Sequence, residues 1–217
     1  MNNKIFRFRN YSSNINDSCF ISIDWGLFTG SIIIFNNDNL YIIDKRFITL
    51  LNDKAHLNGL PFHSRNILLD KILGKIMHKH IYIIWEDIFI PDDERSKNFF
   101  TILKHEVDWF VQGLLIGLNS SNKCYYINMP CRIMKNLFGE HNEKNGVINF
   151  IKNRCLLLFD EINKLNDPQH SLDALFHLFF QLINSAVDEL YINKIIFIQE
   201  DGHREVLFNK SIQLIKK

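Results

Sequence analysis

Three short apolar segments lie close together between residues 19 and 44, and their spacing restricts the fold more than any other feature of the sequence. The first, 19–24, ends in an acid, the second, 31–35, is rich in β-branched residues, and the third is 40–44. Residues 36–39 are Asn, Asn, Asp and Asn, which tolerate the positive φ angles of a tight hairpin. The pattern predicts three adjacent antiparallel strands that open a mixed sheet.

The rest of the chain alternates between helical and strand-like periodicity. Apolar residues recur with a helical period in four segments, and β-branched or aromatic runs form three more. The expected helices are 63–79, 96–118, 142–157 and 168–184, and the expected strands are 80–85, 123–129 and 192–198, followed by a tail at 206–215. This order is that of an α/β fold. We expect one domain over 18–217, preceded by a flexible, polar arm at 1–17.

Composition narrows the class of protein further. With 25 Lys and Arg against 24 Asp and Glu, the net charge is +1, so the chain lacks the overall basic excess typical of nucleic-acid binders. No apolar run reaches the roughly 18 residues of a membrane span, so we expect no membrane partner. The four Cys have no zinc-binding spacing, which favours reduced thiols in an intracellular compartment such as the cytoplasm.

Acidic residues occupy positions where ligands collect in α/β proteins. Asp24 and Glu86 each end a predicted strand, and strand ends in such sheets border a crevice. Asp173 lies in an apolar helical segment, with His170 on the same helix face at i, i+3. A carboxyl group among apolar neighbours is either ionised beside a cation or protonated with a raised pKa. A divalent metal would offset the repulsion of converging acids, although any one strand-end Asp is more often a solvated cap.

Two further histidines and one helix have less specific interpretations. His105 and His177 are expected to be ordinary, half-buried residues. The apolar face of the 96–118 helix is expected to be core or a dimer interface.

The order of six segments resembles the RuvC-type Holliday junction resolvases of the RNase H-like superfamily, and most closely their poxvirus branch. The resemblance covers roughly residues 18–184. The segments are ISIDWG at 21–26, IIWE at 83–86, QGLL at 112–115, KCYYINMP at 123–130, EKNGVINF at 143–150 and KLNDPQHSLDAL at 164–175.

This resemblance implies an RNase H-like mixed sheet, with three antiparallel strands and then two parallel ones, flanked by helices. It implies that Asp24, Glu86, His170 and Asp173 bind two Mg²⁺ or Mn²⁺ ions, and that Lys144 is the active-site base or phosphate clamp. The implied activity is endonucleolytic phosphodiester hydrolysis at a four-way DNA junction in recombination and repair. Branched DNA would be the partner, a homodimer would match the two-fold junction, and a viral replication site is a possible location.

The same fold leaves two alternatives to this activity. A 3′–5′ exonuclease of the same fold needs D-x-E in the first strand, and Gly26 stands at that Glu position. A catalytically degenerate RNase H-fold protein could instead act as a scaffold in a replication or packaging complex. The acids Asp92, Asp93 and Glu94 after the second motif, and the single cation Lys144 in place of a basic run, leave room for this second alternative.

Overall fold

The computed structural model describes residues 17–26, 29–44, 80–88, 90–118, 123–130, 133–139, 142–199 and 202–215. The expected helix at 63–79 and nearly all of the expected arm at 1–17 lie outside these residues. The described strands are β1 (Ser18–Trp25), β2 (Gly30–Asn36), β3 (Asn39–Asp44), β4 (His80–Glu86), β5 (Lys123–Met129), β6 (Glu189–Gln199) and β7 (Gly202–Gln213). The described helices are α3 (Glu94–Leu118), α4 (Ile133–Phe138), α5 (Glu143–Arg154), α6 (Leu156–Ile162) and α7 (Pro168–Asn184).

All the described strands join one sheet, in the order β5-β4-β1-β2-β3-β6-β7. Strands β1, β2 and β3 are antiparallel neighbours, whereas β4 is parallel to β1 and β5 is parallel to β4. This confirms the expected α/β fold with a mixed sheet of three antiparallel strands and then two parallel ones. On the other edge, β6 pairs in parallel with β3, and β7 returns antiparallel to β6.

The predicted hairpin between β2 and β3 is confirmed by its backbone. Asn37 and Asp38 have φ angles of 48° and 60°, and Asn36 pairs with Asn39 across the turn. Asn and Asp are enriched in this left-handed region, where most residues other than Gly are strained. The local turn chemistry therefore fixes the register of these two strands.

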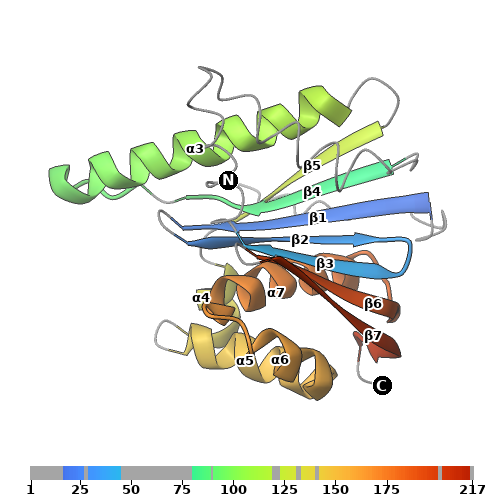
Figure 1. Ribbon diagram of the computed structural model, residues 1–217. Coiled ribbons are helices and arrows are strands. Elements are labelled where there is room, and N and C mark those ends of the chain that lie inside the picture. The colour runs from blue at the N-terminus through green and yellow to red at the C-terminus, as the bar shows by residue number, and fades with distance from the viewer. Residues whose placement is uncertain are drawn as a thin grey trace.

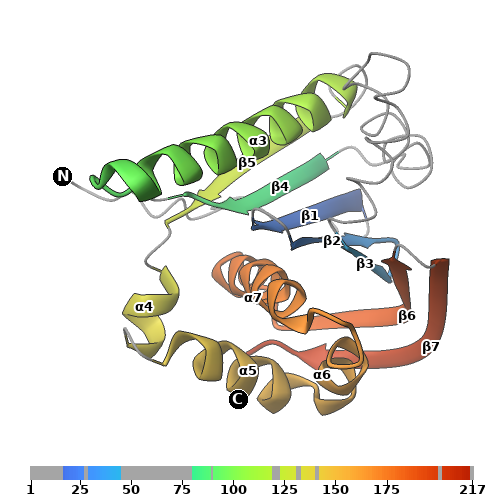
Figure 2. The same ribbon diagram turned by 60° about the vertical axis from the view of Figure 1, so that its left-hand side comes forward.

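Helices cover both faces of the sheet (Figure 1). Helix α3 lies along one face, above a core cluster that contains Ile21, Ile83 and Val107. Helix α7 packs on β1, β2 and β4 from the opposite side, and α5 and α6 pack against α7 (Figure 2). Strands β6 and β7 curve around α7. Just after β7, the backbone oxygen of Leu214 accepts a hydrogen bond from Arg154 Nε of α5 at 2.9 Å. None of the helices in these ranges is long and apolar enough to cross a membrane.

The observed helices differ from the expected ones in two places. The single helix expected at 142–157 is wrong: α5 ends at Arg154, and α6 starts at Leu156 and runs on to Ile162. The break lies at Cys155, whose backbone is extended with φ −156° and ψ 96°. The short helix α4 was not expected at all. The prediction of one domain over 18–217 stays a prediction.

Candidate active site

Strand alternation places Asp24 and Glu86 on the sheet face that α7 covers. On β1, Ser22 faces α7, because its hydroxyl donates to Ala174 O at 2.8 Å. Asp24 is two residues further along, so it shares that face. Strand β4 runs parallel to β1, with Ile23 paired to Trp85, so Glu86 ends its strand beside Asp24. The two acids therefore meet at one edge of the sheet.

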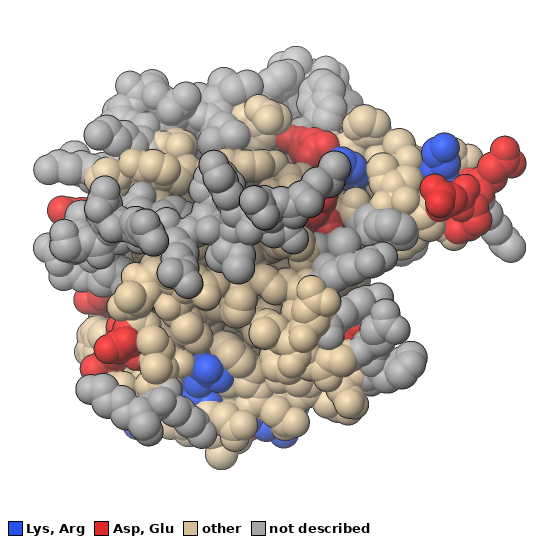
Figure 3. All heavy atoms as spheres, turned by 180° about the vertical axis from the view of Figure 1, so that it is seen from behind, with Lys and Arg blue, Asp and Glu red and all other residues tan. Residues whose placement is uncertain are grey.

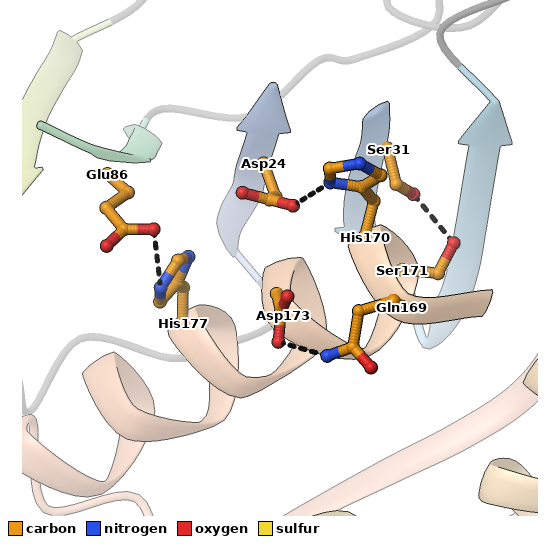
Figure 4. Close-up of polar contacts among 8 residues, drawn as sticks. All are labelled: Asp24, Ser31, Glu86, Gln169, His170, Ser171, Asp173 and His177. Atoms are coloured by element: carbon orange, nitrogen blue, oxygen red, sulfur yellow. Dashed lines mark hydrogen bonds and ion pairs between the residues drawn. The ribbon is translucent and has the colours of Figure 1, made fainter. Parts of the chain in front are cut away.

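Helix α7 brings the remaining polar side chains to the same edge (Figure 4). His170, Asp173 and His177 are spaced i, i+3 and i+7, which places them along one helix face. Pro168 begins the helix just before them, at a position where the missing N–H group of proline costs no helical hydrogen bond. The hydroxyl of Ser171 donates to that of Ser31 at 2.9 Å and ties the start of α7 to β2.

Three contacts organise these side chains. Nδ1 of His170 contacts Oδ2 of Asp24 in a short hydrogen bond. Nε2 of Gln169 donates to Oδ1 of Asp173 at 2.9 Å. Nε2 of His177 lies 3.9 Å from Oε2 of Glu86. Figure 4 shows the three pairs side by side along α7 and the ends of β1 and β4.

Gly26 makes room for the contact between His170 and Asp24. A Cβ atom at Gly26 would lie 2.9 Å from His170 Cε1 and 2.7 Å from the carbonyl oxygen of Thr29. Any larger side chain at this position would displace the imidazole ring. The exonuclease alternative requires a glutamate at this position, whereas this chain has Gly26, against which His170 packs.

Burial and mutual repulsion raise the pKa of two of the carboxyl groups. Burial, together with the charges of Asp24 and Asp173, raises the pKa of Glu86 to about 8. Burial and the charge of Asp24 raise the pKa of Asp173 to about 7, despite the hydrogen bond from Gln169. The two acids and Asp24 are therefore close enough for their charges to conflict, as the sequence predicted for Asp173.

The pKa values of His170 and His177 shift in opposite directions. The hydrogen bond to Asp24 raises the pKa of His170 against the opposing effect of burial. Complete burial lowers the pKa of His177 to about 4, so its ring is neutral at pH 7. The expectation that His105 and His177 are half-buried is wrong for both, because His105 is exposed and His177 is fully enclosed.

Lys144 lies in the first turn of α5, with an exposed side chain. Its charge lowers the pKa of Asp173, although less than the contacts of Gln169 and His170 do. Among the expected site residues, the structure thus brings Asp24, Glu86, His170 and Asp173 together. Lys144 lies at the periphery of this group, within electrostatic reach of Asp173.

The charges of this site suit a divalent cation. Within the described residues, no three His, Cys, Asp or Glu side chains are grouped tightly enough to hold a metal ion as they stand. The raised pKa values of Glu86 and Asp173 nevertheless show buried carboxyl groups whose charges lack sufficient compensation. Oxygen donors with one imidazole nitrogen fit Mg²⁺ or, better, Mn²⁺.

A cleft of about 480 Å³ gives access to the same strand ends from the side of α3. Its lining combines Asp24 and Glu86 with the aromatic residues Trp25, Trp85 and Phe100. The acids are therefore reachable from solvent although they lie deep in the fold.

Two acids in the loop before α3, Asp87 and Asp93, form hydrogen bonds within the fold. Lys104 Nζ donates to Asp87 Oδ1 at 2.9 Å, and Asp93 Oδ1 accepts from the backbone N–H of Ser96 at 2.8 Å. Figure 3 shows acidic and basic side chains together at the projecting start of α3, where Asp92 and Glu94 are exposed. This end of the helix would repel a phosphate backbone unless Lys and Arg residues compensate.

Comparisons with known proteins give limited results. No protein-family model matches the chain, and no curated protein matches it. Among solved structures, the chain is similar to T. thermophilus RuvC in complex with Holliday junction substrate, with a TM-score of 0.38 and 11% sequence identity. The match covers 77% of this chain and 97% of the other.

Proposed function

We propose that this protein is a metal-dependent, structure-selective endonuclease that resolves four-way DNA junctions. The observation that carries the proposal is the convergence of Asp24, Glu86 and Asp173, with His170, at one edge of an RNase H-like sheet. The order of the sequence motifs supports the narrower assignment to the Holliday junction resolvases and their poxvirus branch. Branched DNA is the proposed substrate.

The proposed ligands of the cations are Asp24, Glu86, His170 and Asp173. Two bound divalent ions would activate a water molecule and stabilise the leaving 3′-oxygen during in-line displacement. Buried carboxylates suit this role, because burial strengthens their interaction with a cation.

The chain's own contacts prepare these ligands. The contact with Asp24 fixes the ring of His170, and the hydrogen bond from Gln169 orients Asp173 through one of its oxygens. The ammonium group of Lys144, exposed on the first turn of α5, would bind a phosphate oxygen near Asp173. These side chains would hold the scissile phosphate next to the acids.

We further propose that the protein acts as a homodimer in a reducing intracellular compartment such as the cytoplasm, including a viral replication site. Cys19, Cys124 and Cys155 are free thiols, which is in keeping with a reducing setting.

The test is incubation of the protein with an end-labelled synthetic four-way junction, with Mg²⁺, with Mn²⁺ and with a chelator. We expect symmetric nicks only in the presence of a cation. Asp24→Asn and Asp173→Asn should each reduce cleavage at least about a thousandfold but leave folding intact, because the amide keeps the volume and removes the charge of a ligand.

Asp160→Asn is the matched control, because Asp160 is an exposed acid on α6. It should cleave like the wild type. Wild-type cleavage by either site variant would refute the assignment of the site.

A scaffold without catalysis is the second candidate. It is favoured by the contact of His170 with Asp24, which already engages one oxygen of the central carboxylate. A folded protein that binds the junction but cleaves it with neither cation would support this alternative.

A further inference from the structure

His177 is enclosed in the core next to the candidate active site. It lies one turn after Asp173 on α7, with an exposed fraction of 0%. Its ring packs edge-on against Phe176, with 5.8 Å between the ring centroids. The packing holds the imidazole in one position, on the helix face that carries His170 and Asp173 (Figure 4).

Neither ring nitrogen of His177 has a hydrogen-bond partner among the described residues. An unsatisfied buried polar group destabilises a fold, so an apolar side chain would fill this position at lower free energy. Such a group in a folded protein indicates a role that packing does not explain. A carboxyl oxygen lies near it: Oε2 of Glu86 is 3.9 Å from Nε2 of His177.

We propose that His177 is a positioning residue for Glu86: its Nε2–H group donates to one carboxylate oxygen and leaves the other for a divalent cation. The proposal rests on the proposed function. The present 3.9 Å separation exceeds a hydrogen bond, which spans about 2.7–3.2 Å. The approach must come from Glu86, because its side chain has three rotatable bonds at a strand end, whereas the His177 ring is held by core packing.

The arrangement explains why a polar ring is kept in the core. A carboxylate that binds a cation is oriented by hydrogen bonds to its other oxygen, and loss of such a partner weakens metal binding about 10–100-fold. Within the part of the chain that the structure describes, Nε2 of His177 is a side-chain nitrogen that lies near the Glu86 carboxyl group. A donor from α7 would also lock Glu86 onto the helix that carries Asp173.

The experiment measures Mn²⁺ affinity by isothermal titration calorimetry for the wild type, His177→Leu and His177→Gln. Leucine fills the volume without a donor, whereas glutamine keeps an N–H group. We expect His177→Leu to bind Mn²⁺ about 10–100-fold more weakly and His177→Gln to recover most of that loss. In metal-free buffer, His177→Leu should melt at or above the wild-type temperature, because an unsatisfied polar ring is removed.

Gln181→Leu is the matched control. Gln181 is also buried and polar and lies one turn further along α7, away from the acids. It should leave Mn²⁺ affinity unchanged. If His177→Leu does not fold, His177→Met replaces it with the same expectation.

Two results overturn the inference. Equal Mn²⁺ affinity in folded His177→Leu and wild type would show a purely structural histidine and would leave the proposed function standing. Absence of Mn²⁺ binding by the wild type would remove the proposed metal site as well.

Discussion

Glu86 is buried at the end of β4 beside two other carboxyl groups, and this environment couples the stability of the fold to pH. In the unfolded chain its carboxyl group ionises near pH 4.5, whereas in the folded protein it keeps its proton up to about pH 8. Between these values the unfolded state has lost the proton that the folded state retains. The contribution of Glu86 to the free energy of unfolding is therefore fully present below pH 4.5 and is lost as the pH rises to about 8.

We predict that Glu86→Gln stabilises the metal-free protein at pH 8. The amide carries no charge to be buried, so the free energy of unfolding should rise by about 1–4 kcal/mol, which corresponds to several degrees in Tm. The difference should shrink toward pH 5. Thermal unfolding in a chelating buffer at both pH values measures the effect. Asp160→Asn should show no such difference, and an unchanged Tm of Glu86→Gln at pH 8 would contradict the prediction.

Single residues were predictable from the sequence where their position follows from local periodicity. Asp24 and Glu86 end apolar strands, and His170 and Asp173 share a helix face, so their proximity could be anticipated. The burial of His177 could not, because it depends on how closely α7 approaches the sheet.

That close approach is set by small side chains. Three buried serines lie between α7 and the strands and form hydrogen bonds across this interface: Ser22, Ser31 and Ser171. Serines within apolar runs give no signal of such pairing in the sequence.

At the scale of elements, α5 starts in tight contact with α4. A Cβ atom at Gly146 would lie 2.2 Å from Cγ of Phe138, which is far inside van der Waals contact. Phe138 in turn packs edge-on against Phe176 of α7, with centroids 5.5 Å apart. Gly146 therefore allows α4 to bridge α5 and α7.

We predict that Gly146→Ala destabilises the protein by about 1–3 kcal/mol, because Phe138 must move out of its packed position. This predicted loss is net of the gain of about 1 kcal/mol that alanine brings to a helix interior. Urea unfolding measures the change. Asn145→Ala, at an exposed neighbouring position, should be neutral or slightly stabilising, and a gain in stability for Gly146→Ala would refute the packing argument.

Elements with a clear local signal were predicted, and those set by distant contacts were not. Strands β1 to β5 and helices α3 and α7 carry strong periodicity. The break at Cys155 has no Gly or Pro to mark it, and α4 is only six residues long. The pairing of β6 with β3 joins segments far apart in the chain, which local sequence patterns do not encode.

At the scale of the whole molecule, α3 determines which surface is left for a second copy. Leu103, Val107 and Val111 of its apolar face are buried in this chain, so they are not available as the expected dimer interface. Phe99 and Ile102 remain 39% and 57% exposed near the projecting end of the helix. The candidate interface is thus narrowed to this exposed pair.

We predict a homodimer that Ile102→Glu weakens at least about tenfold, because an interface core excludes an unpaired charge. Sedimentation equilibrium at micromolar concentration measures the dissociation constant. Leu157→Glu is the control, because Leu157 is 50% exposed on α6, another helix. A wild-type protein that stays monomeric even with junction DNA would contradict the dimer.

The candidate site is assembled from segments that are far apart in the sequence. Asp24 and His170 touch across 146 positions of sequence. During synthesis, the ribosome releases Asp24 and Glu86 long before α7 exists, so a nascent or prematurely terminated polypeptide exposes its acids without the helix that completes them. The proposed nuclease activity would therefore be absent from a nascent chain until α7 has been translated.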